Sequence, residues 1–177
     1  MSHIQYALVL IQRWDKTLCV RLNGALRFAP LLHGFRAVSW LGDGIFWYSL
    51  MLALLLHQGR DAAGAVVHMA LAGVVCTAVY KLLKRSTLRP RPYEVMSVVA
   101  RGAAPLDAFS FPSGHTLHAV AFTLIAASYY PWLAAILAPF TLLVASSRVI
   151  LGLHYPSDVL AGALIGAAIA VGSFVAF

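Results

Sequence analysis

Basic residues, histidines and small polar residues gather in three clusters between residues 84 and 158 of this 177-residue chain. In chain order the clusters are Lys84 with Arg91-Pro92, then Pro112-Ser113-Gly114-His115, and then Ser147-Arg148 with His154 and Asp158. A phosphate monoester carries close to two negative charges, and its transfer spreads charge over the equatorial oxygens. Fixed cations and hydrogen-bond donors beside histidines therefore indicate phosphoryl-transfer chemistry.

The phosphate itself would be bound by Lys84, Arg91 and Arg148. Each arginine offers a planar fork of N–H donors that matches phosphate oxygens, and Lys84 adds a compact charge. Gly114 removes a side chain where the backbone would approach the phosphate, and the amides that begin the next helix would point toward it. Ser113 adds a hydroxyl, so these five residues form a predicted phosphate clamp.

The two histidines can divide the roles of nucleophile and acid. A neutral imidazole can attack phosphorus, whereas an imidazolium can donate a proton to the leaving oxygen. We predict that His154 attacks and that His115 donates. Asp158 lies one helical turn beyond His154 if that turn is helical, so it could fix the tautomer of His154 and stabilise its charge.

The elements that must position these residues are membrane-spanning helices. The chain is 61% hydrophobic and 11% charged, and it contains long stretches without any charge. Stretches of roughly 20 residues can cross a hydrocarbon core about 30 Å thick as helices, and lipid offers no partner for free backbone groups. We predict an all-α, polytopic transmembrane bundle of about five spans, near residues 37–56, 62–83, 115–130, 132–149 and 158–177.

The chain divides into an N-terminal segment, 1–36, and a transmembrane domain, 37–177, that carries all three clusters. The N-terminal segment has apolar stretches, but basic residues interrupt them too soon for a span. It is predicted to lie in the membrane interface as an amphipathic helix, with Tyr6 and Trp14 as anchors. In the last span, Gly162, Gly166 and Ala170 would let a neighbouring helix approach closely, although glycine is also simply frequent in membrane helices.

Counting through the spans brings the three clusters to one membrane face. Of the 13 lysines and arginines, this leaves Arg60 alone on the opposite face. Each cluster has an alternative explanation: a basic cuff for lipid head groups, a helix start capped by Ser113, and an interfacial pair of His154 with a capping Asp158. The occurrence of all three on one face favours the catalytic interpretation.

Four further residues lie near the predicted site or inside a span. Asp43 is expected near the interface, paired with a basic residue. His118 follows His115 by one helical turn and is expected either to contact the site residues or to pack between helices. Arg89 is expected to be a solvated surface residue, with contact to a head group as the alternative. His68 is expected to be a neutral, hydrogen-bonded packing residue.

The arrangement of Lys84 and Arg91-Pro92, then residues 112–115, then Ser147-Arg148 with His154 and Asp158 resembles the three-part signature of the type 2 phosphatidic acid phosphatase superfamily. No signature position departs from it. The resemblance covers most of the chain except the first 36 residues. Soluble vanadium haloperoxidases share the signature, but five apolar spans argue against that branch.

The resemblance implies a mechanism without a metal. His154 would form a phosphohistidine, oriented by Asp158, while His115 would protonate the leaving lipid alkoxide and water would then hydrolyse the intermediate. The phosphoryl oxygens would be held by Lys84, Arg91, Ser113, Gly114, His115 and Arg148.

The predicted function is hydrolysis of a phosphomonoester or pyrophosphate of an isoprenoid lipid, such as undecaprenyl pyrophosphate, or of a glycerolipid. The motifs equally allow a phosphotransferase that passes the phosphate to a second lipid or sugar. A non-catalytic lipid-binding or transport protein is a third possibility, against which the complete catalytic set argues.

No metal site and no cofactor are predicted, because the acids near the clusters are only Glu94, Asp107 and Asp158. The two cysteines are predicted to form no disulfide. The expected partners are a lipid phosphate substrate and membrane lipids, with no nucleic acid, and the sequence gives no signal of an oligomeric state. The expected location is the cytoplasmic membrane. Bacterial relatives often work at its outer face, whereas the positive-inside rule favours a cytosolic site.

Overall fold

The computed structural model describes residues 3–177, and all regular elements in that part of the chain are helical. The longer elements are α1 (His3–Asn23), α2 (Ala29–Trp40), α3 (Phe46–Gln58), α4 (Ala63–Thr87), α6 (Gly114–Tyr129), α7 (Ala134–Ile150) and α8 (Pro156–Ser173), with a one-turn helix α5 at Pro92–Val95. The prediction of an all-α fold is confirmed.

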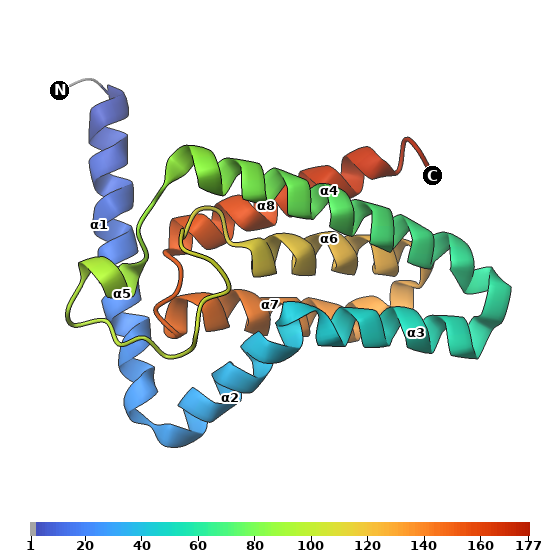
Figure 1. Ribbon diagram of the computed structural model, residues 1–177, viewed down its shortest axis with the longest axis horizontal. Helices are drawn as coiled ribbons and strands as arrows, with labels where there is room; N and C mark the ends of the chain where they lie inside the picture. The colour runs from blue at the N-terminus through green and yellow to red at the C-terminus, as the bar shows by residue number, and fades with distance from the viewer. Residues whose placement is uncertain (1–2) are drawn as a thin grey trace.

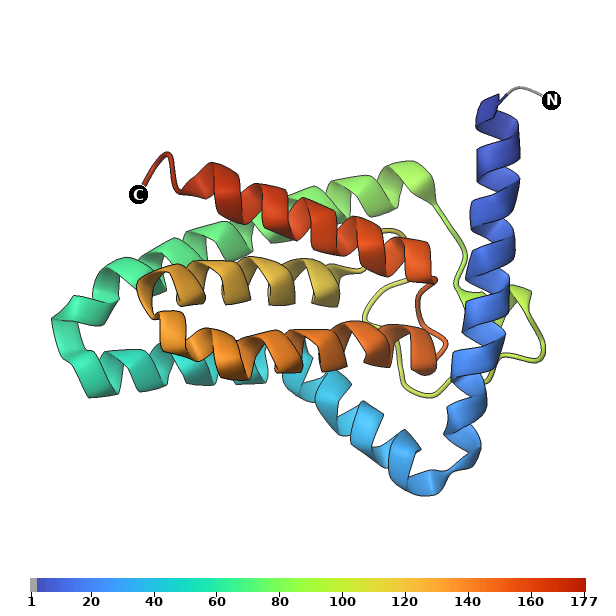
Figure 2. The ribbon, with the colours of Figure 1, turned by 180° about the vertical axis from the view of Figure 1, so that it is seen from behind.

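Five helices run side by side and form an elongated bundle: α3, α4, α6, α7 and α8 (Figure 1). Helix α6 is central, because it packs against α4, α7 and α8. The largest buried apolar cluster includes Trp47, Phe122, Ile125 and Leu137. Helix α1 lies across one end of the bundle, steeply inclined to the other helices, and α2 runs diagonally from it to α3 (Figure 2).

The protein crosses the membrane several times. Within the described residues, three helical stretches are long and apolar enough to span a bilayer: Ala29–Val95, Pro131–Ile150 and Pro156–Ser173. The first of these contains two legs, since the chain reverses at the turn Gly59–Ala62 between α3 and α4. The count of five spans stays a prediction, and so does the boundary at residue 36, which lies inside α2.

A break separates α2 from α3 and turns one acidic residue toward the bundle. Helical geometry is interrupted in the segment Leu41–Ile45, where Gly44 has φ of 126°. Only glycine adopts this backbone conformation without strain, and a Cβ atom there would also lie 2.9 Å from the Tyr48 ring. Because of this break, Asp43 lies beside α6 and not on a continuous helix surface.

Small residues allow α8 to lie directly against α6. A Cβ atom added to Gly162 would lie 2.6 Å from the backbone oxygen of Ser113, and one added to Gly166 would collide with the backbone of Leu117. The prediction that these glycines permit close helix approach is confirmed. The contact matters for the site because Ser113 begins the segment that opens α6, and its N–H donates to the backbone oxygen of Asp158 at 3.0 Å.

We expect Gly162→Ala to destabilise the protein by about 1–3 kcal/mol, the range typical of overpacked cores. The added methyl group would push apart α6 and α8 at Ser113, so the predicted phosphatase activity should fall as well. Thermal unfolding in detergent, followed by circular dichroism, measures the first effect. Gly172→Ala in the same helix is the matched control, because apart from the adjacent backbone of α8 no atom of residues 3–177 lies within 4 Å of the new methyl group. Equal melting temperatures for the two variants would contradict this account.

Candidate active site

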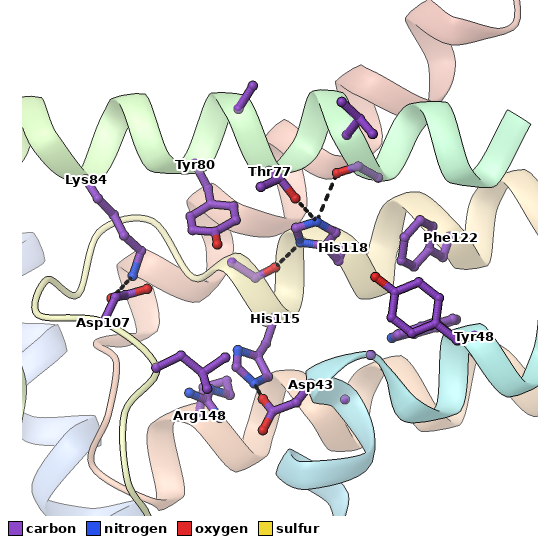
Figure 3. Close-up of a pocket in the computed structure, with 18 of the residues that line it drawn as sticks. Asp43, Tyr48, Thr77, Tyr80, Lys84, Asp107, His115, His118, Phe122 and Arg148 are labelled. Carbon is purple, nitrogen blue, oxygen red and sulfur yellow. Dashed lines mark hydrogen bonds and ion pairs between the residues drawn. The ribbon is translucent and has the colours of Figure 1, made fainter.

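A cavity of about 680 Å³ opens between α3, α4 and α6 near the end of the bundle that α1 covers (Figure 3). Its polar end is lined by Lys84, Arg91, Asp107, Gly114, His115, Arg148, His154 and Asp43. The other end is apolar and includes Met51, Val74 and Phe122. Of the predicted catalytic and phosphate-binding residues, all but Ser113 and Asp158 line the cavity. Both are fully buried behind its wall.

Lys84 and Arg91 share one carboxylate. The Lys84 Nζ atom lies 2.6 Å from Asp107 Oδ1 and 2.6 Å from the Phe109 carbonyl oxygen. Arg91 Nη2 lies 2.8 Å from the same Asp107 oxygen, and Arg91 Nη1 donates to the Leu153 carbonyl at 2.7 Å. Partial burial acts to raise the pKa of Asp107, but the two cations outweigh it and hold that pKa below its usual value. Asp107 therefore supplies a permanent negative charge between two of the predicted phosphate ligands.

Arg148 is the cation with spare hydrogen-bonding capacity. Its side chain is buried at the end of α7, and Nη1 donates to the hydroxyl of Ser39. Its Nε atom is buried and has no hydrogen-bond partner within the described part of the chain. A buried donor without a partner is rare in proteins, and the guanidinium that carries it also lines the cavity.

His154 lies in the loop between α7 and α8 with one ring nitrogen fixed. Its Nδ1 atom is 2.6 Å from the backbone oxygen of Ser110, which can only accept, so Nδ1 carries the proton. The other nitrogen, Nε2, then presents a lone pair. This nitrogen accepts a long hydrogen bond of 3.4 Å from Arg91 Nη1, so it lies on the side of the cations.

The expected direct contact between Asp158 and His154 has to be corrected. Asp158 Oδ2 lies 3.8 Å from His154 Nδ1, beyond hydrogen-bond distance. Helix α8 begins at Pro156, so residues 154–158 do not form a continuous helical turn. The carboxylate instead accepts from the Tyr155 backbone N–H at 2.9 Å and from Arg89 at 2.5 Å. The tautomer of His154 is therefore set by Ser110, with Asp158 close enough for an electrostatic effect.

Burial, together with the positive charges of Arg148, Arg91 and Lys84, holds the pKa of His154 well below its usual range. Because this pKa is depressed, the imidazole should stay neutral as the pH falls through about 6.5, the ordinary histidine value. Titration of the side-chain nitrogen resonances in ¹⁵N-histidine-labelled protein, assigned with a His154→Gln variant, tests this directly. A midpoint at or above the ordinary value would show that the cation cluster does not act on His154.

His115 opens α6 and pairs with an acid from another element. Its Nε2 atom bonds to Asp43 Oδ1 in the break between α2 and α3 (Figure 3). The expectation that Asp43 pairs with a basic residue is confirmed. His118, one turn further, lies 2.9 Å from the Gly114 carbonyl and 3.1 Å from Thr77 Oγ1, so it ties α6 to α4 at the cavity wall. His68 is a buried packing residue as predicted, bonded to Tyr129 and Ser173.

This geometry agrees with the comparison to known families. The family model described as the PAP2 superfamily matches residues 61–177. The chain belongs to the PAP2 superfamily. The match starts within the turn before α4 and includes every residue of the three polar clusters.

Individual PAP2 proteins resemble the chain over most of its length. It is 34% identical to decaprenylphosphoryl-5-phosphoribose phosphatase of Mycobacterium tuberculosis, over 89% of this chain and 87% of that protein. It is 29% identical to lipid A 1-phosphatase of Rhizobium johnstonii, over 88% and 77% of the two chains. The crystal structure of LpxE from Aquifex aeolicus superposes with a TM-score of 0.73 at 26% identity, over 91% of this chain and 94% of that one.

A second crystal structure supports the fold alone. The PAP2-type phosphatidylglycerolphosphate phosphatase of Bacillus subtilis superposes with a TM-score of 0.74 at 24% identity, over 94% of this chain and 85% of that one.

The family model and the named relatives confirm the predicted family and the prediction of a membrane lipid phosphatase. PAP2 phosphatases act without a metal cofactor.

Several polar residues of this PAP2 site were not assigned a role from the sequence. Asp107 and the Ser110 carbonyl lie in the connection before α6, between the first and second clusters, and belong to neither motif. Arg89, expected to be solvated, instead bridges Asp15 and Asp158. Only Arg89 left a usable signal, because it stands two positions before Arg91 inside the first cluster.

Proposed function

We propose that this PAP2 phosphatase hydrolyses lipid phosphates through a phosphohistidine on His154. The observation that carries the proposal is that His154, with Nε2 unprotonated, lines a cavity that is also lined by three cationic side chains. A neutral imidazole beside fixed positive charge is suited to attack an anionic phosphorus centre.

In the first step, His154 Nε2 forms a bond to phosphorus while the bond from phosphorus to the leaving lipid oxygen breaks. His115 gives a proton to that oxygen, and Asp43, which is bonded to His115 Nε2, orients the ring for this transfer. In the second step, His115 takes a proton from water, the water oxygen attacks phosphorus, and the N–P bond breaks. Inorganic phosphate leaves and both histidines return to their starting forms.

We propose that the phosphoryl oxygens are bound by Lys84, Arg91, Arg148 and the first turn of α6. Gly114 lines the cavity, and backbone N–H groups at a helix start attract anions. Ser113 caps that helix by accepting from Thr116, and we assign it to the same anion-binding turn. Asp158 would assist His154 electrostatically from 3.8 Å.

The apolar end of the cavity supports a lipid as the substrate. Helix α3 contributes Tyr48 and Met51, helix α4 contributes Val74, and both Tyr48 and Val74 are largely exposed on the surface of the bundle. Figure 3 shows Tyr48 from α3 below α4, with the polar residues to one side of it. We propose that the phosphate reaches the site from the bilayer and that its lipid tail leaves between α3 and α4.

The proposed substrate class is a phosphomonoester or pyrophosphate of an isoprenoid lipid or glycerolipid. The named relatives act on lipid A and on decaprenylphosphoryl-5-phosphoribose, both of which are lipids. These relatives come from bacteria, and we propose the cytoplasmic membrane as the location of the protein. A phosphotransferase would use the same residues and differ only in the acceptor for the second step.

We expect a much higher kcat/KM for long-chain lipid phosphates than for their water-soluble head-group analogues. Each methylene kept from water contributes roughly 0.8 kcal/mol, and only a lipid tail can use the apolar walls between α3 and α4. Phosphate release in mixed micelles at controlled surface concentration measures the ratio. Equal efficiency for both substrate types would contradict access from the bilayer without affecting the histidine chemistry.

The same assay, run on a panel of lipid phosphates and pyrophosphates with a chelator present, tests the function as a whole. Metal-independent release of inorganic phosphate, inhibited by vanadate as a mimic of the pentacovalent phosphoryl group, is the expected result. Transfer of labelled phosphate to an added lipid or sugar alcohol in preference to water would identify a phosphotransferase. Binding without turnover of any member would leave only a lipid-binding protein.

A further inference from the structure

Helix α1 presents a polar face to the bundle at regular helical spacing. Asp15, Cys19 and Asn23 follow each other at intervals of four residues and are 2%, 0% and 5% exposed. Their neighbour Trp14 is 71% exposed. Residues four apart lie on one side of a helix, so this face covers the end of the bundle where α7 joins α8 (Figure 2).

Asp15 binds the beginning of α8. Its Oδ1 atom accepts from the Ser157 backbone N–H at 2.9 Å, and Oδ2 accepts from the Ser157 hydroxyl at 2.5 Å. Oδ2 also accepts from Arg89 Nη2 at 2.7 Å. A carboxylate at the start of a helix is favourable because the helix dipole is positive there.

Arg89 connects Asp15 to the acid beside the nucleophile. Its Nη1 atom lies 2.9 Å from Ser157 Oγ and 2.5 Å from Asp158 Oδ1, and its guanidinium stacks 4.0 Å from the centre of the Tyr155 ring. Arg89 is absent from the residues that line the active-site cavity. It therefore contacts the segment 155–158 from behind and does not face the phosphate pocket.

The buried negative charge of Asp158 requires the ion pair with Arg89. A fully buried carboxylate is costly unless a cation and further donors compensate it, and Arg89 is the cation bonded to Asp158. An arginine fork can hold two carboxylates in fixed directions, as it does here with Asp15 and Asp158. Loss of the Asp15 charge would leave Arg89 anchored at one end only.

The other end of the same loop is also attached to α1. Asn23 Nδ2 donates to the carbonyls of Ile150 and Ala100, each at 2.9 Å, and the Ala100 N–H donates to Asn23 Oδ1 at 2.8 Å. Cys19 Sγ lies 3.8 Å from the carbonyl oxygen of His154. Helix α1 thus holds residues on both sides of His154 as well as its backbone.

From these contacts we infer that Asp15 and Arg89 are positioning residues for His154, so that the N-terminal helix is part of the catalytic apparatus although it lies outside the family-matched residues 61–177. The inference rests on the proposed role of His154 as nucleophile. Displacement of a reacting atom by about 1 Å can reduce a rate by 10²-fold, so small movements of the loop should be visible in kcat.

The test compares Asp15→Asn with Thr17→Ala, a change at an exposed position of the same helix. Asparagine keeps the size of Asp15 but removes the charge that balances Arg89. We expect kcat of Asp15→Asn to fall by about 10- to 100-fold while KM stays near the wild-type value, because the cations of the pocket are untouched. Vanadate binding stoichiometry, which counts molecules with an intact phosphate pocket, should equal that of Thr17→Ala.

Two results would overturn the inference. One is a kcat for Asp15→Asn equal to that of Thr17→Ala. The other is a vanadate stoichiometry that falls in proportion to kcat, since Asp15 would then affect only the fraction of folded protein.

A double-mutant cycle with Arg89→Gln adds a second measurement. If the two residues act through one network, the double variant should be little slower than the slower single variant, whereas independent effects would multiply and contradict the inference. A separate rapid-quench experiment on the wild-type protein checks for acid-labile phosphate on His154. Its absence would reject the proposed phosphohistidine, which separates failure of the function from failure of the positioning role.

Discussion

His154→Ala is expected to abolish phosphate release from every lipid phosphate that the wild-type protein hydrolyses. An alanine cannot attack phosphorus, and loss of a nucleophile typically costs roughly 10⁴- to 10⁶-fold in kcat. Continuous detection of inorganic phosphate from purified protein in mixed micelles measures the loss. The variant should still bind vanadate non-covalently, because Lys84, Arg91 and Arg148 remain in the pocket.

His57→Ala serves as the matched control, since His57 is exposed near the end of α3, far along the chain from the site. It should retain wild-type turnover. After a rapid quench of the reaction with ³²P-labelled substrate, wild-type and His57→Ala protein should carry an acid-labile ³²P label. His154→Ala protein should carry none. Substantial phosphate release by His154→Ala would remove this residue from the nucleophile role and would direct attention to His115.

Arg148→Ala is expected to produce the second-largest loss, about 10²- to 10³-fold in kcat, as for removal of one transition-state donor. Lys84→Ala and Arg91→Ala should also lose orders of magnitude. Arg148 should be the most sensitive of the three, because Lys84 and Arg91 already share Asp107, whereas Arg148 Nε has no hydrogen-bond partner among the described residues. Single-turnover measurements with saturating lipid phosphate separate this loss from weaker substrate binding.

Arg60→Ala is the control for removal of a positive charge, since Arg60 lies in the turn between α3 and α4 at the opposite end of the bundle. Arg148→Lys adds a finer comparison, because lysine keeps the charge but not the fork of donors. We expect it to recover only part of the activity. Near-normal activity in all three alanine variants would show that the proposed phosphate clamp is wrong.

The sequence was sufficient to predict the helical membrane fold and the family, because both depend on patterns that are local in the chain. Charge-free stretches indicate spans, and the separations among Lys84, Arg91, His115, Arg148 and His154 define the family signature. The structure brings these residues to one cavity, as the count through the spans predicts. Their catalytic and phosphate-binding roles remain proposals.

The contacts around the site were not predictable because their members are distant in sequence. Asp15 and Arg89 are 74 residues apart, and Asp43 and His115 are 72 apart. Hydropathy reports the average composition of a segment, so it cannot show that a charged residue is buried by an element from elsewhere in the chain. It also did not show the break at Gly44, which divides the predicted span 37–56 into parts of α2 and α3.

Helix α1 shows both the value and the limit of pattern reading. Its amphipathic character predicted an interfacial helix, and the structure places it across the end of the bundle. The amphipathic pattern did not predict the inward polar face of Asp15, Cys19 and Asn23, which only the structure shows. The helix predicted to lie in the membrane interface therefore also contacts the loop that carries His154.

Asp107 would make the proposed phosphate binding an ion exchange. Its carboxylate neutralises part of the charge on Lys84 and Arg91, so a phosphate that takes up both cations replaces one anion by another. Fewer mobile counterions are released by such an exchange than by binding to three free cations, so the affinity for phosphate should depend only weakly on ionic strength. The site can therefore discriminate a phosphate held at the correct geometry from the general attraction of a basic surface for anions, which salt suppresses.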